Sequence, residues 1–177
     1  GHSFFFPRQV ASNMAAMIHK KVQRMLGKSR LRRRTEGIQF LHSSQVGAAE
    51  QLLGAGAFSQ VTKVRLATSS SKMYYACKSL KPELMSDTKG FVTAATELAY
   101  EAHMLSSFDH PNIIKIRGWA SNGIASFEEG SHDSFFLLLD LLEHTLDERV
   151  DQWKKITATE PLQKRCLAIE KINVLQQ

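Results

Sequence analysis

The first strong pattern in the chain is a set of apolar residues spaced three and four positions apart near its N-terminus. The set comprises Val10, Met14, Met17, Ile18, Val22, Met25 and Leu26. Because this spacing brings side chains to one side of an α-helix, it predicts a helix with a single apolar stripe. Ser12 or Asn13 is expected to cap its start, and Gly27 its end.

A different pattern begins at about residue 47, where short stretches rich in strand-forming residues alternate with turn formers. Strands are predicted at 51–53, 61–66, 73–78, 113–119 and 135–142. The last of these is almost entirely apolar, as is typical of a strand buried on both faces.

One helix is predicted within this region, at 93–107, where Leu98 and Leu105 lie seven residues apart. The sequence Asp109-His110-Pro111-Asn112 should end it, because proline disfavours helical geometry in the residue before it. The polar stretch 121–134 is expected to form an exposed loop. The whole pattern is that of an α+β protein.

The net charge of +6 is concentrated at the N-terminus. Residues 1–35 carry nine Lys or Arg and no acid, whereas residues 36–177 carry fourteen Lys or Arg against seventeen acids, so the two parts have charges of +9 and −3. Residues 1–46 are therefore expected to form a basic arm, partly helical or disordered. One interpretation is a solvated arm, and the others are nuclear import or polyanion binding through residues 20–34 or a helix that binds a groove.

Two cysteines, Cys77 and Cys166, are too few for a disulfide framework. No apolar run approaches the roughly 20 residues that span a bilayer, so no transmembrane segment is expected. These observations favour an intracellular protein of the cytoplasm or nucleus. The histidines and cysteines lack the spacing of a metal site, so no metal ligand is expected among them.

The stretch GAGAFSQV, residues 54–61, places two glycines one residue apart. Glycines at such spacing allow a ligand, often a phosphate, to approach the main chain. The pattern alone is weak, because Ser59 stands where a third glycine would complete G-x-G-x-x-G. A strand is predicted after it instead of a helix, which excludes the usual dinucleotide-binding motif.

Four stretches in the right order resemble the protein kinase superfamily. They are LLGAGAFSQV, YYACKSL, ELAYEAHMLSSFDHPNIIKI and FFLLLDLLEHTLDERV, and the resemblance covers residues 47–177. It implies a kinase-like N-lobe and hinge at 47–144, with an antiparallel sheet and one regulatory helix, and the first helices of an incomplete C-lobe at 145–177.

The resemblance also implies an ATP site. The glycine loop would cover the phosphates, small or apolar side chains would form a roof over adenine, and the hinge would present main-chain groups to its edge. The residues expected in these roles are Leu53, Gly54, Ala55, Gly56, Ala57, Phe58, Ser59, Val61, Ala76, Leu139, Asp140 and Leu142.

Lys78 is implied as the residue that reaches the phosphates. Its side chain carries about 2 kcal/mol of rotamer entropy, so it needs an anchor. Glu97 and Glu101 are both suitable carboxylates, and the family's usual distance to His-Pro-Asn favours Glu101, nine residues before His110. Lys78 and Glu101 are therefore the predicted catalytic pair.

The H-R-D and D-F-G motifs, which supply the catalytic aspartate and the ligands of Mg²⁺ in kinases, do not occur in these 177 residues. The helical spacing of apolar residues in 161–177 is typical of a C-lobe helix that precedes the catalytic loop. The chain alone is thus expected to be inactive, and Mg²⁺ ligands are expected in the rest of the C-lobe.

The function favoured by these observations is ATP-dependent phosphorylation of protein substrates by the intact kinase, on Ser or Thr hydroxyls because that specificity is common in the family. The alternative is a non-catalytic nucleotide-binding or interaction module derived from a kinase, with a polyanion-binding basic arm.

Overall fold

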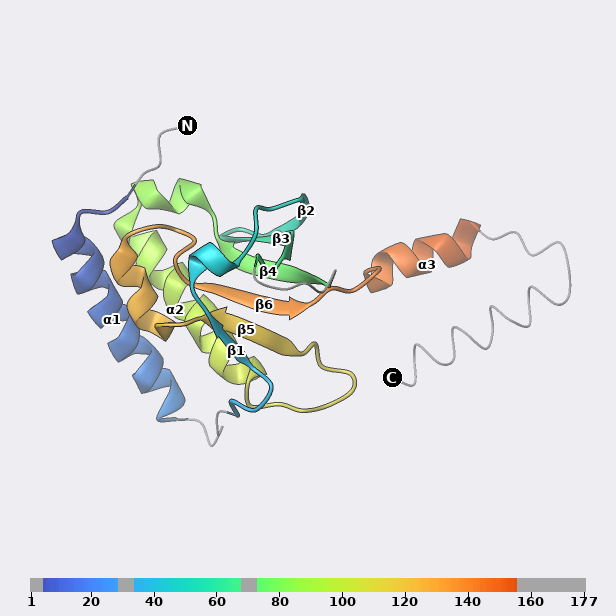
Figure 1. Cartoon of the computed structure of the whole chain (residues 1–177), viewed down its shortest axis with the longest axis horizontal. Helices are drawn as coiled ribbons and strands as arrows, with labels where there is room; N and C mark the ends of the chain where they lie inside the picture. The colour runs from blue at the N-terminus through green and yellow to red at the C-terminus, as the bar shows by residue number, and fades with distance from the viewer. Residues whose placement is uncertain (1–4, 29–33, 68–72, 156–177) are drawn as a thin grey trace, which may run out of the picture. The chain divides into compact units, whose positions relative to one another are not determined.

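A computed structural model describes residues 5–28, 34–67 and 73–155. The chain divides into two compact units, Gly1–Leu141 and Leu142–Gln177. Figure 1 shows the elements of both units. The helix predicted at 161–177, like Cys166, lies outside the described residues.

The first unit is built on a six-stranded mixed sheet with the order β1-β5-β6-β4-β3-β2. Its strands are β1 (Gln39–Leu41), β2 (Gln51–Ala55), β3 (Ser59–Arg65), β4 (Tyr74–Leu80), β5 (Ile116–Ala120) and β6 (Phe136–Asp140). The predicted α+β fold is confirmed, and each predicted strand has its counterpart here.

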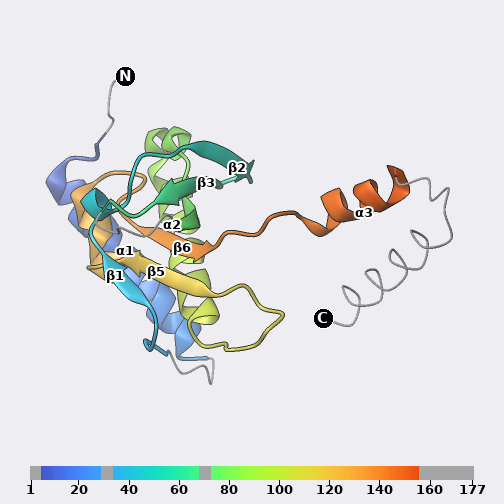
Figure 2. The same cartoon turned by 45° about the vertical axis from the view of Figure 1, so that its right-hand side comes forward.

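The sheet departs from the expected antiparallel arrangement at one edge. Strand β1 pairs with β5 in parallel, with Gln39 opposite Gly118 and Leu41 opposite Ala120. Figure 2 shows the two strands side by side. Strand β1 was missed because it has three residues and lies in the stretch that we assigned to the arm, where no alternation is long enough to indicate a strand.

Two long helices pack in the same unit, α1 (Arg8–Leu26) and α2 (Thr88–Leu105). Helix α2 begins earlier than predicted, because the Asp87 carboxylate caps it by accepting a hydrogen bond of 3.0 Å from the backbone N–H of Lys89. Eight of its residues are buried: Phe91, Val92, Ala94, Ala95, Thr96, Leu98, Ala99 and Ala102.

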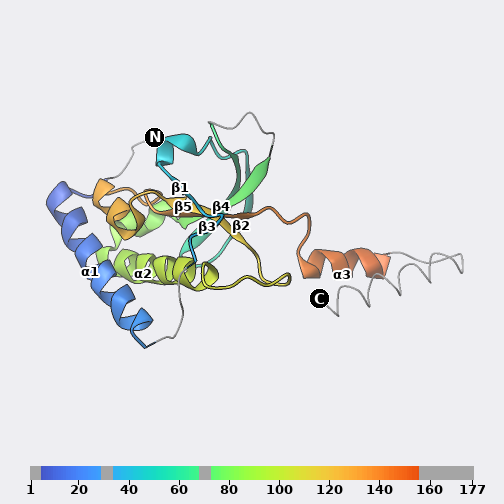
Figure 3. The same ribbon diagram turned by 60° about the horizontal axis from the view of Figure 1, so that its bottom comes forward.

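Helix α1 is part of the folded unit and does not form a solvated arm. Its N-cap is Pro7, so it starts before the predicted Ser12 or Asn13, and Gly27 ends it as expected. The buried stripe consists of Ala11, Met14, Ala15, Ile18 and Val22. Figure 3 shows α1 beside α2.

Three short 3-10 helices connect these elements: η1 (Ser43–Gln45), η2 (Pro82–Ser86) and η3 (Gly123–Glu129). Helix η3 lies in the stretch predicted as an exposed loop, yet its Ser126 and Phe127 are buried. The loop is therefore partly a core element, and α1 packs against it.

The second unit contains α3 (Leu146–Lys155), where the first helix of a C-lobe was expected. Thr145 and Glu148 form a capping box at its start: the Thr145 N–H donates to Glu148 Oε2 at 2.8 Å, and the Glu148 N–H donates to Thr145 Oγ1 at 3.2 Å. Hydrogen bonding of the carboxylate to the Thr145 backbone N–H, and then to the Thr145 side chain, lowers the pKa of the Glu148 carboxyl because it favours the charged form.

Candidate nucleotide site

Strand β4 presents Lys78 on the same face of the sheet as Ala76. Side chains alternate along a strand, so residues two apart share a face. Lys78 lies opposite Val61 of β3 and opposite Leu137 of β6. The strand thus places Lys78 between two apolar residues of the neighbouring strands, and its side chain lines a cavity together with residues of α2.

Helix α2 brings Glu101 to Lys78. The Lys78 Nζ donates hydrogen bonds to both carboxylate oxygens of Glu101, at 2.8 Å to Oε1 and 2.6 Å to Oε2. The exposed fractions of the two side chains are 23% and 38%. Solvent therefore screens part of the attraction, and the pair is better suited to orienting Lys78 than to stabilising the fold.

Glu97 lies one turn earlier on α2 and is exposed. It lines the same cavity as Lys78 and Glu101, whose volume is about 150 Å³. Lys78 donates its hydrogen bonds to Glu101. The structure therefore brings all three charged residues together and pairs Lys78 with the nearer carboxylate.

Three further residues of this cavity were not predicted from the sequence, namely Leu80, Ala94 and Leu98. Periodicity offered a signal for each of them. Leu80 lies two positions after Lys78 on β4, and Ala94 and Leu98 precede Glu97 and Glu101 by three residues on α2.

The glycine loop joins β2 to β3 above this cavity. Gly54 lies opposite Val61, and a register shift falls between Leu52 and Gly54, so Leu53 is the irregular residue. The loop turns tightly, because the Gly56 N–H donates to the Ser59 carbonyl at 2.8 Å. Its tip residues Ala57, Phe58 and Ser59 line the cavity.

Open space surrounds the two glycines. A Cβ placed on Gly54 would meet nothing within 4 Å, and one on Gly56 would come no closer than 3.8 Å to the Ser59 carbonyl oxygen. The fold itself therefore does not require glycine at either position. The open space leaves room for a group, such as a phosphate, to approach the backbone there.

The expected roof and hinge residues differ in how far they are buried. Ala76 and Leu139 are buried and lie opposite each other on β4 and β6. Asp140 ends β6, and its carboxylate accepts hydrogen bonds from Arg117 at 2.6 and 3.2 Å, which raise the pKa of that guanidinium. Leu142 belongs to the second unit and is 63% exposed.

Comparison with known families gives a single clear result. The family described as protein kinase domain matches residues 48–171, well over half of the chain. The chain belongs to the protein kinase family. Helix α1 and strand β1 precede the part of this kinase that the family matches.

One relative of the kinase is the ephrin type-B receptor 4 of Mus musculus. The two sequences are 32% identical over an alignment of 99 residues, and the match covers 51% of this chain and 9% of the receptor. The chain thus spans less than a tenth of the length of the curated relative that it matches.

Two further observations concern what the described part of the kinase contains. None of its helices is long and apolar enough to cross a membrane. In the ranges 5–28, 34–67 and 73–155, no three or more His, Cys, Asp or Glu residues gather so that they could hold a metal ion.

Proposed function

We propose that this kinase binds ATP between the glycine loop and α2, and that it transfers the γ-phosphate to protein hydroxyls. The observation that supports the proposal best is the contact of Lys78 with both carboxylate oxygens of Glu101 at the edge of a cavity that the glycine loop lines. An ammonium group has three N–H donors, and two of those of Lys78 go to Glu101, so one remains to donate to a phosphate oxygen.

The roles of individual residues follow from their positions. Glu101 holds the Lys78 side chain so that its charge faces the phosphates, which removes the rotamer entropy that binding would otherwise cost. The loop amides around Gly54 and Gly56 approach the phosphates through the open space at these positions. Ala76, Val61 and Leu53 provide the apolar roof, and Leu139 and Asp140 the inner hinge.

ATP reacts as its Mg²⁺ complex in this family, and the metal neutralises charge that develops on the phosphates. The described residues contain no cluster of carboxylates that would hold the ion. The pattern of the kinase family places its ligands in a catalytic loop and a D-F-G motif, neither of which occurs among these 177 residues. The residues of this chain act on the nucleotide directly.

The first test compares ATP with adenosine as ligands of the 177-residue chain and its Lys78→Met variant. Methionine removes the charge and keeps most of the apolar stem. We expect the variant to bind ATP about tenfold more weakly, a loss of ~1.4 kcal/mol, because a charge-assisted hydrogen bond to phosphate is lost. Adenosine affinity should stay within about twofold, because Lys78 makes no contact with the base. Isothermal titration calorimetry measures both.

Two carboxylate variants complete this test. Glu101→Gln should weaken ATP binding less than Lys78→Met does, and Glu97→Gln should have a smaller effect than Glu101→Gln. A larger loss in Glu97→Gln would show that the anchor of Lys78 is Glu97, one turn earlier on α2, and that our assignment of Glu101 is wrong. Equal loss of ATP and adenosine in Lys78→Met would contradict the phosphate contact itself.

For the acceptor we propose Ser or Thr, on the prevalence of this specificity among protein kinases. A kinase domain that contains both this chain and a catalytic loop can be assayed on peptide pairs that differ only in Ser, Thr or Tyr. Phosphate on tyrosine alone would overturn the assignment. A chain that binds ATP but never supports transfer would favour the alternative, a non-catalytic nucleotide-binding module.

We also propose that α1 contributes to polyanion binding. Three basic residues of α1 are exposed, namely Lys20, Lys21 and Arg24, and so is Lys28 just after the helix. No acid occurs in residues 1–35 to neutralise them. Arg34, at the end of the basic stretch, instead pairs with Asp109 at 3.3 Å, and residues 29–33 lie outside the described part of the chain.

The test replaces these four residues by glutamine and measures the affinity for a DNA duplex over a salt series. The slope of log K against log salt is negative, and each lost phosphate contact should make it shallower by about 0.9. Lys89→Gln, on exposed α2 surface, serves as the control for a lost charge elsewhere. An unchanged slope in the fourfold variant would remove α1 from any polyanion site.

A further inference from the structure

The N-terminal extension of this kinase packs against the helix that carries Glu101. Residues 5–28 precede the family match, which starts at residue 48. Helix α1 nevertheless contacts α2 and η3 extensively, while the opposite side of α2 faces strands β4 and β5. Helix α2 is thus held between the sheet and a segment that lies outside the family match.

The first contact lies at the start of α2. The Phe6 ring packs edge-on against Phe91, with 5.1 Å between ring centroids, and Phe91 packs in the same way against Phe127 of η3 at 5.8 Å. The Phe6 N–H also donates a hydrogen bond of 2.9 Å to the carbonyl of Gly130. Phe6 therefore fixes the beginning of α1 to both α2 and η3.

The contact with Phe6 requires a glycine at residue 130. Its φ is +77°, in the left-handed region, and a Cβ there would lie 2.8 Å from the Phe6 carbonyl oxygen. By comparison, Gly123 has a φ of +55° and open space around its Cβ position. The close approach of Phe6 thus adds a steric requirement at Gly130 that Gly123 does not have.

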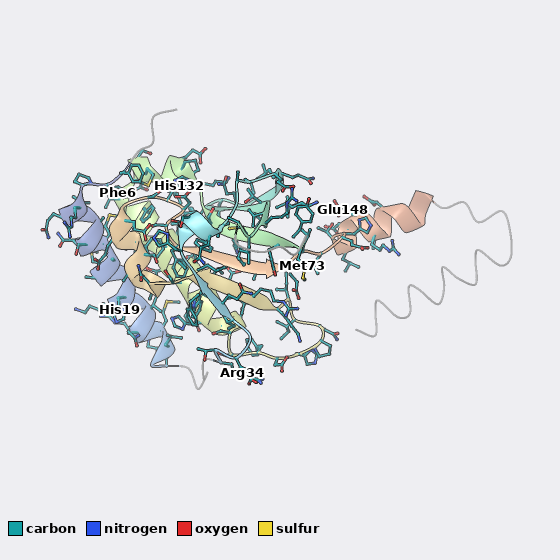
Figure 4. The ribbon with its side chains drawn as sticks, in the orientation of Figure 1. Phe6, His19, Arg34, Met73, His132 and Glu148 are labelled. Carbon is teal, nitrogen blue, oxygen red and sulfur yellow. The ribbon has the colours of Figure 1, made fainter. Side chains whose placement is uncertain are left out.

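The contact continues along both helices. Ile18 and Val22 of α1 are fully buried, as are Ala95, Ala99 and Ala102 of α2. Small side chains on α2 let another element approach its backbone closely. Near the other end, His19 and Gln23 of α1 and His103 of α2 line one cavity. Figure 4 labels Phe6 before the start of α1 and His19 in its second half.

These contacts bear on the ion pair, because Glu101 lies between the two ends at which α1 holds α2. A helix held at one end can rotate or swing, whereas one held at both ends keeps the direction of each side chain. Glu101 reaches Lys78 with bond lengths of 2.6 and 2.8 Å while α1 is docked. A small rotation of α2 would break both bonds.

We propose that α1, anchored by Phe6, acts in cis as a positioning element that keeps α2 oriented for the Lys78–Glu101 pair. The proposal rests on the proposed ATP site, since the consequence of the pairing is a correctly placed Lys78. Phe6 and Gly130 are positioning residues, because neither touches the cavity that Lys78 lines. Displacement of α1 should therefore uncouple Glu101 from nucleotide binding.

The first experiment compares two neighbouring phenylalanines. Phe6 is half-buried and packs against the core, whereas Phe5 is 59% exposed. The variants Phe6→Ala and Phe5→Ala remove the same atoms from adjacent positions of the full chain. Phe6→Ala should weaken ATP binding about fivefold and Phe5→Ala by less than about twofold. Phe6→Leu, which restores apolar contact with Phe91, should recover most of the loss.

The second experiment leaves α1 unaltered. Gly130→Ala and Gly123→Ala impose the same kind of backbone strain at a positive φ, but Gly130→Ala alone also pushes against Phe6. Gly130→Ala should reproduce the effect of Phe6→Ala on ATP affinity. Gly123→Ala should resemble the unmodified chain once both are measured below their unfolding temperatures.

A third measurement separates positioning from simple loss of stability. Glu101→Gln is combined with Phe6→Ala, and the ATP affinities of the single and double variants are compared. If Phe6 acts through Glu101, then Glu101→Gln should weaken binding several-fold in the unmodified chain and by less than about twofold in Phe6→Ala. Additive losses in the double variant would show that Phe6 does not act through the ion pair and would overturn the proposal.

Amide hydrogen exchange provides a readout that needs no nucleotide. Amides of α2 should exchange about tenfold faster in Phe6→Ala and Gly130→Ala than in Phe5→Ala and Gly123→Ala. If the unmodified chain fails to bind ATP, the proposed function is wrong, and hydrogen exchange alone then decides whether α1 orders α2. Equal exchange of α2 in all four variants would overturn the positioning role whatever the nucleotide result.

Discussion

The residues of β4 show how one strand serves two environments. Lys78 and Leu80 line the cavity beside α2, while Cys77 and Ser79 line a second cavity of about 300 Å³ on the other side of the sheet, lined also by Asp133. Cys77 is only 7% exposed. Burial, and then the charge of Asp133, raise the pKa of its thiol to about 12, so it stays protonated at neutral pH.

This environment predicts that Cys77 is inert and that its titration affects stability. In an unfolded chain the thiol ionises with a pKa of about 8.5. Since the folded pKa is the higher one, the contribution to stability is complete below pH ~8.5 and is lost as the pH rises toward 12. Urea unfolding between pH 7 and 10.5 should therefore show a steeper decline for the unmodified chain than for Cys77→Ala.

A reactivity measurement tests the same residue independently. In a Cys166→Ser background, iodoacetamide at pH 8 should label native Cys77 at least about a hundredfold more slowly than the urea-unfolded chain, because the thiolate is the reactive form. Fast labelling of the native chain would mean that Cys77 is neither buried nor protonated as described.

At the scale of elements, β1 depends on a glycine of its neighbour. A Cβ on Gly118 of β5 would lie 3.0 Å from the Gln39 carbonyl oxygen and 3.2 Å from Leu41 Cδ1. Beside it, the Phe40 and Trp119 rings lie 5.9 Å apart, and the Ser121 N–H donates to the Leu41 carbonyl at 2.8 Å. Strand β1 can therefore pair with β5 because residue 118 has no side chain.

Gly118→Val should displace β1 from the sheet. We expect faster amide exchange at residues 39–41 and a melting temperature lower by several degrees, in keeping with a loss of about 1–3 kcal/mol from overpacking. Gly54→Val is the stability control, because a Cβ at Gly54 of β2 meets open space. If the two variants melt alike, the close contact between β1 and β5 is not a constraint on residue 118.

At the scale of the whole molecule, the first compact unit includes the N-terminal residues. Fully buried residues of α1 meet fully buried alanines of α2, and β1 covers the edge of β5. The kinase-like part and the N-terminal segment thus share one core. A boundary near residue 46, as the composition suggested, would cut through that core.

A chain that starts at Val46 should consequently fold poorly. This chain lacks α1 and β1, so the apolar faces of α2 and β5 would be exposed to water. Burial of each aliphatic or aromatic side chain contributes about 1.5–3 kcal/mol to the free energy of unfolding. We expect binding of a hydrophobic dye and loss of a cooperative melting transition. A chain that starts at Phe5 retains every described residue and should melt like the unmodified one. A cooperative melting transition in the chain that starts at Val46 would show that the N-terminal segment is a separate arm.

The sequence by itself determined the features that depend on local order along the chain. Stretches of strand-forming residues between turn formers predicted the strands β2 to β6. Helical spacing of apolar residues predicted the helices α1 and α2, because helix geometry dictates which residues share a face. The resemblance to protein kinases, through the family's usual distance from this glutamate to His-Pro-Asn, selected the carboxylate that the structure places against Lys78. These features needed no knowledge of what packs against them.

Tertiary structure decided what covers each apolar face. The stripe of α1 predicted a buried side but not its partner, since many surfaces satisfy a non-directional hydrophobic contact. Only the folded chain brings Phe6 to Phe91 and lets Gly118 admit β1. Burial of Phe127 in a polar loop and the high pKa of the Cys77 thiol arise in the same way, because both depend on neighbours distant in sequence.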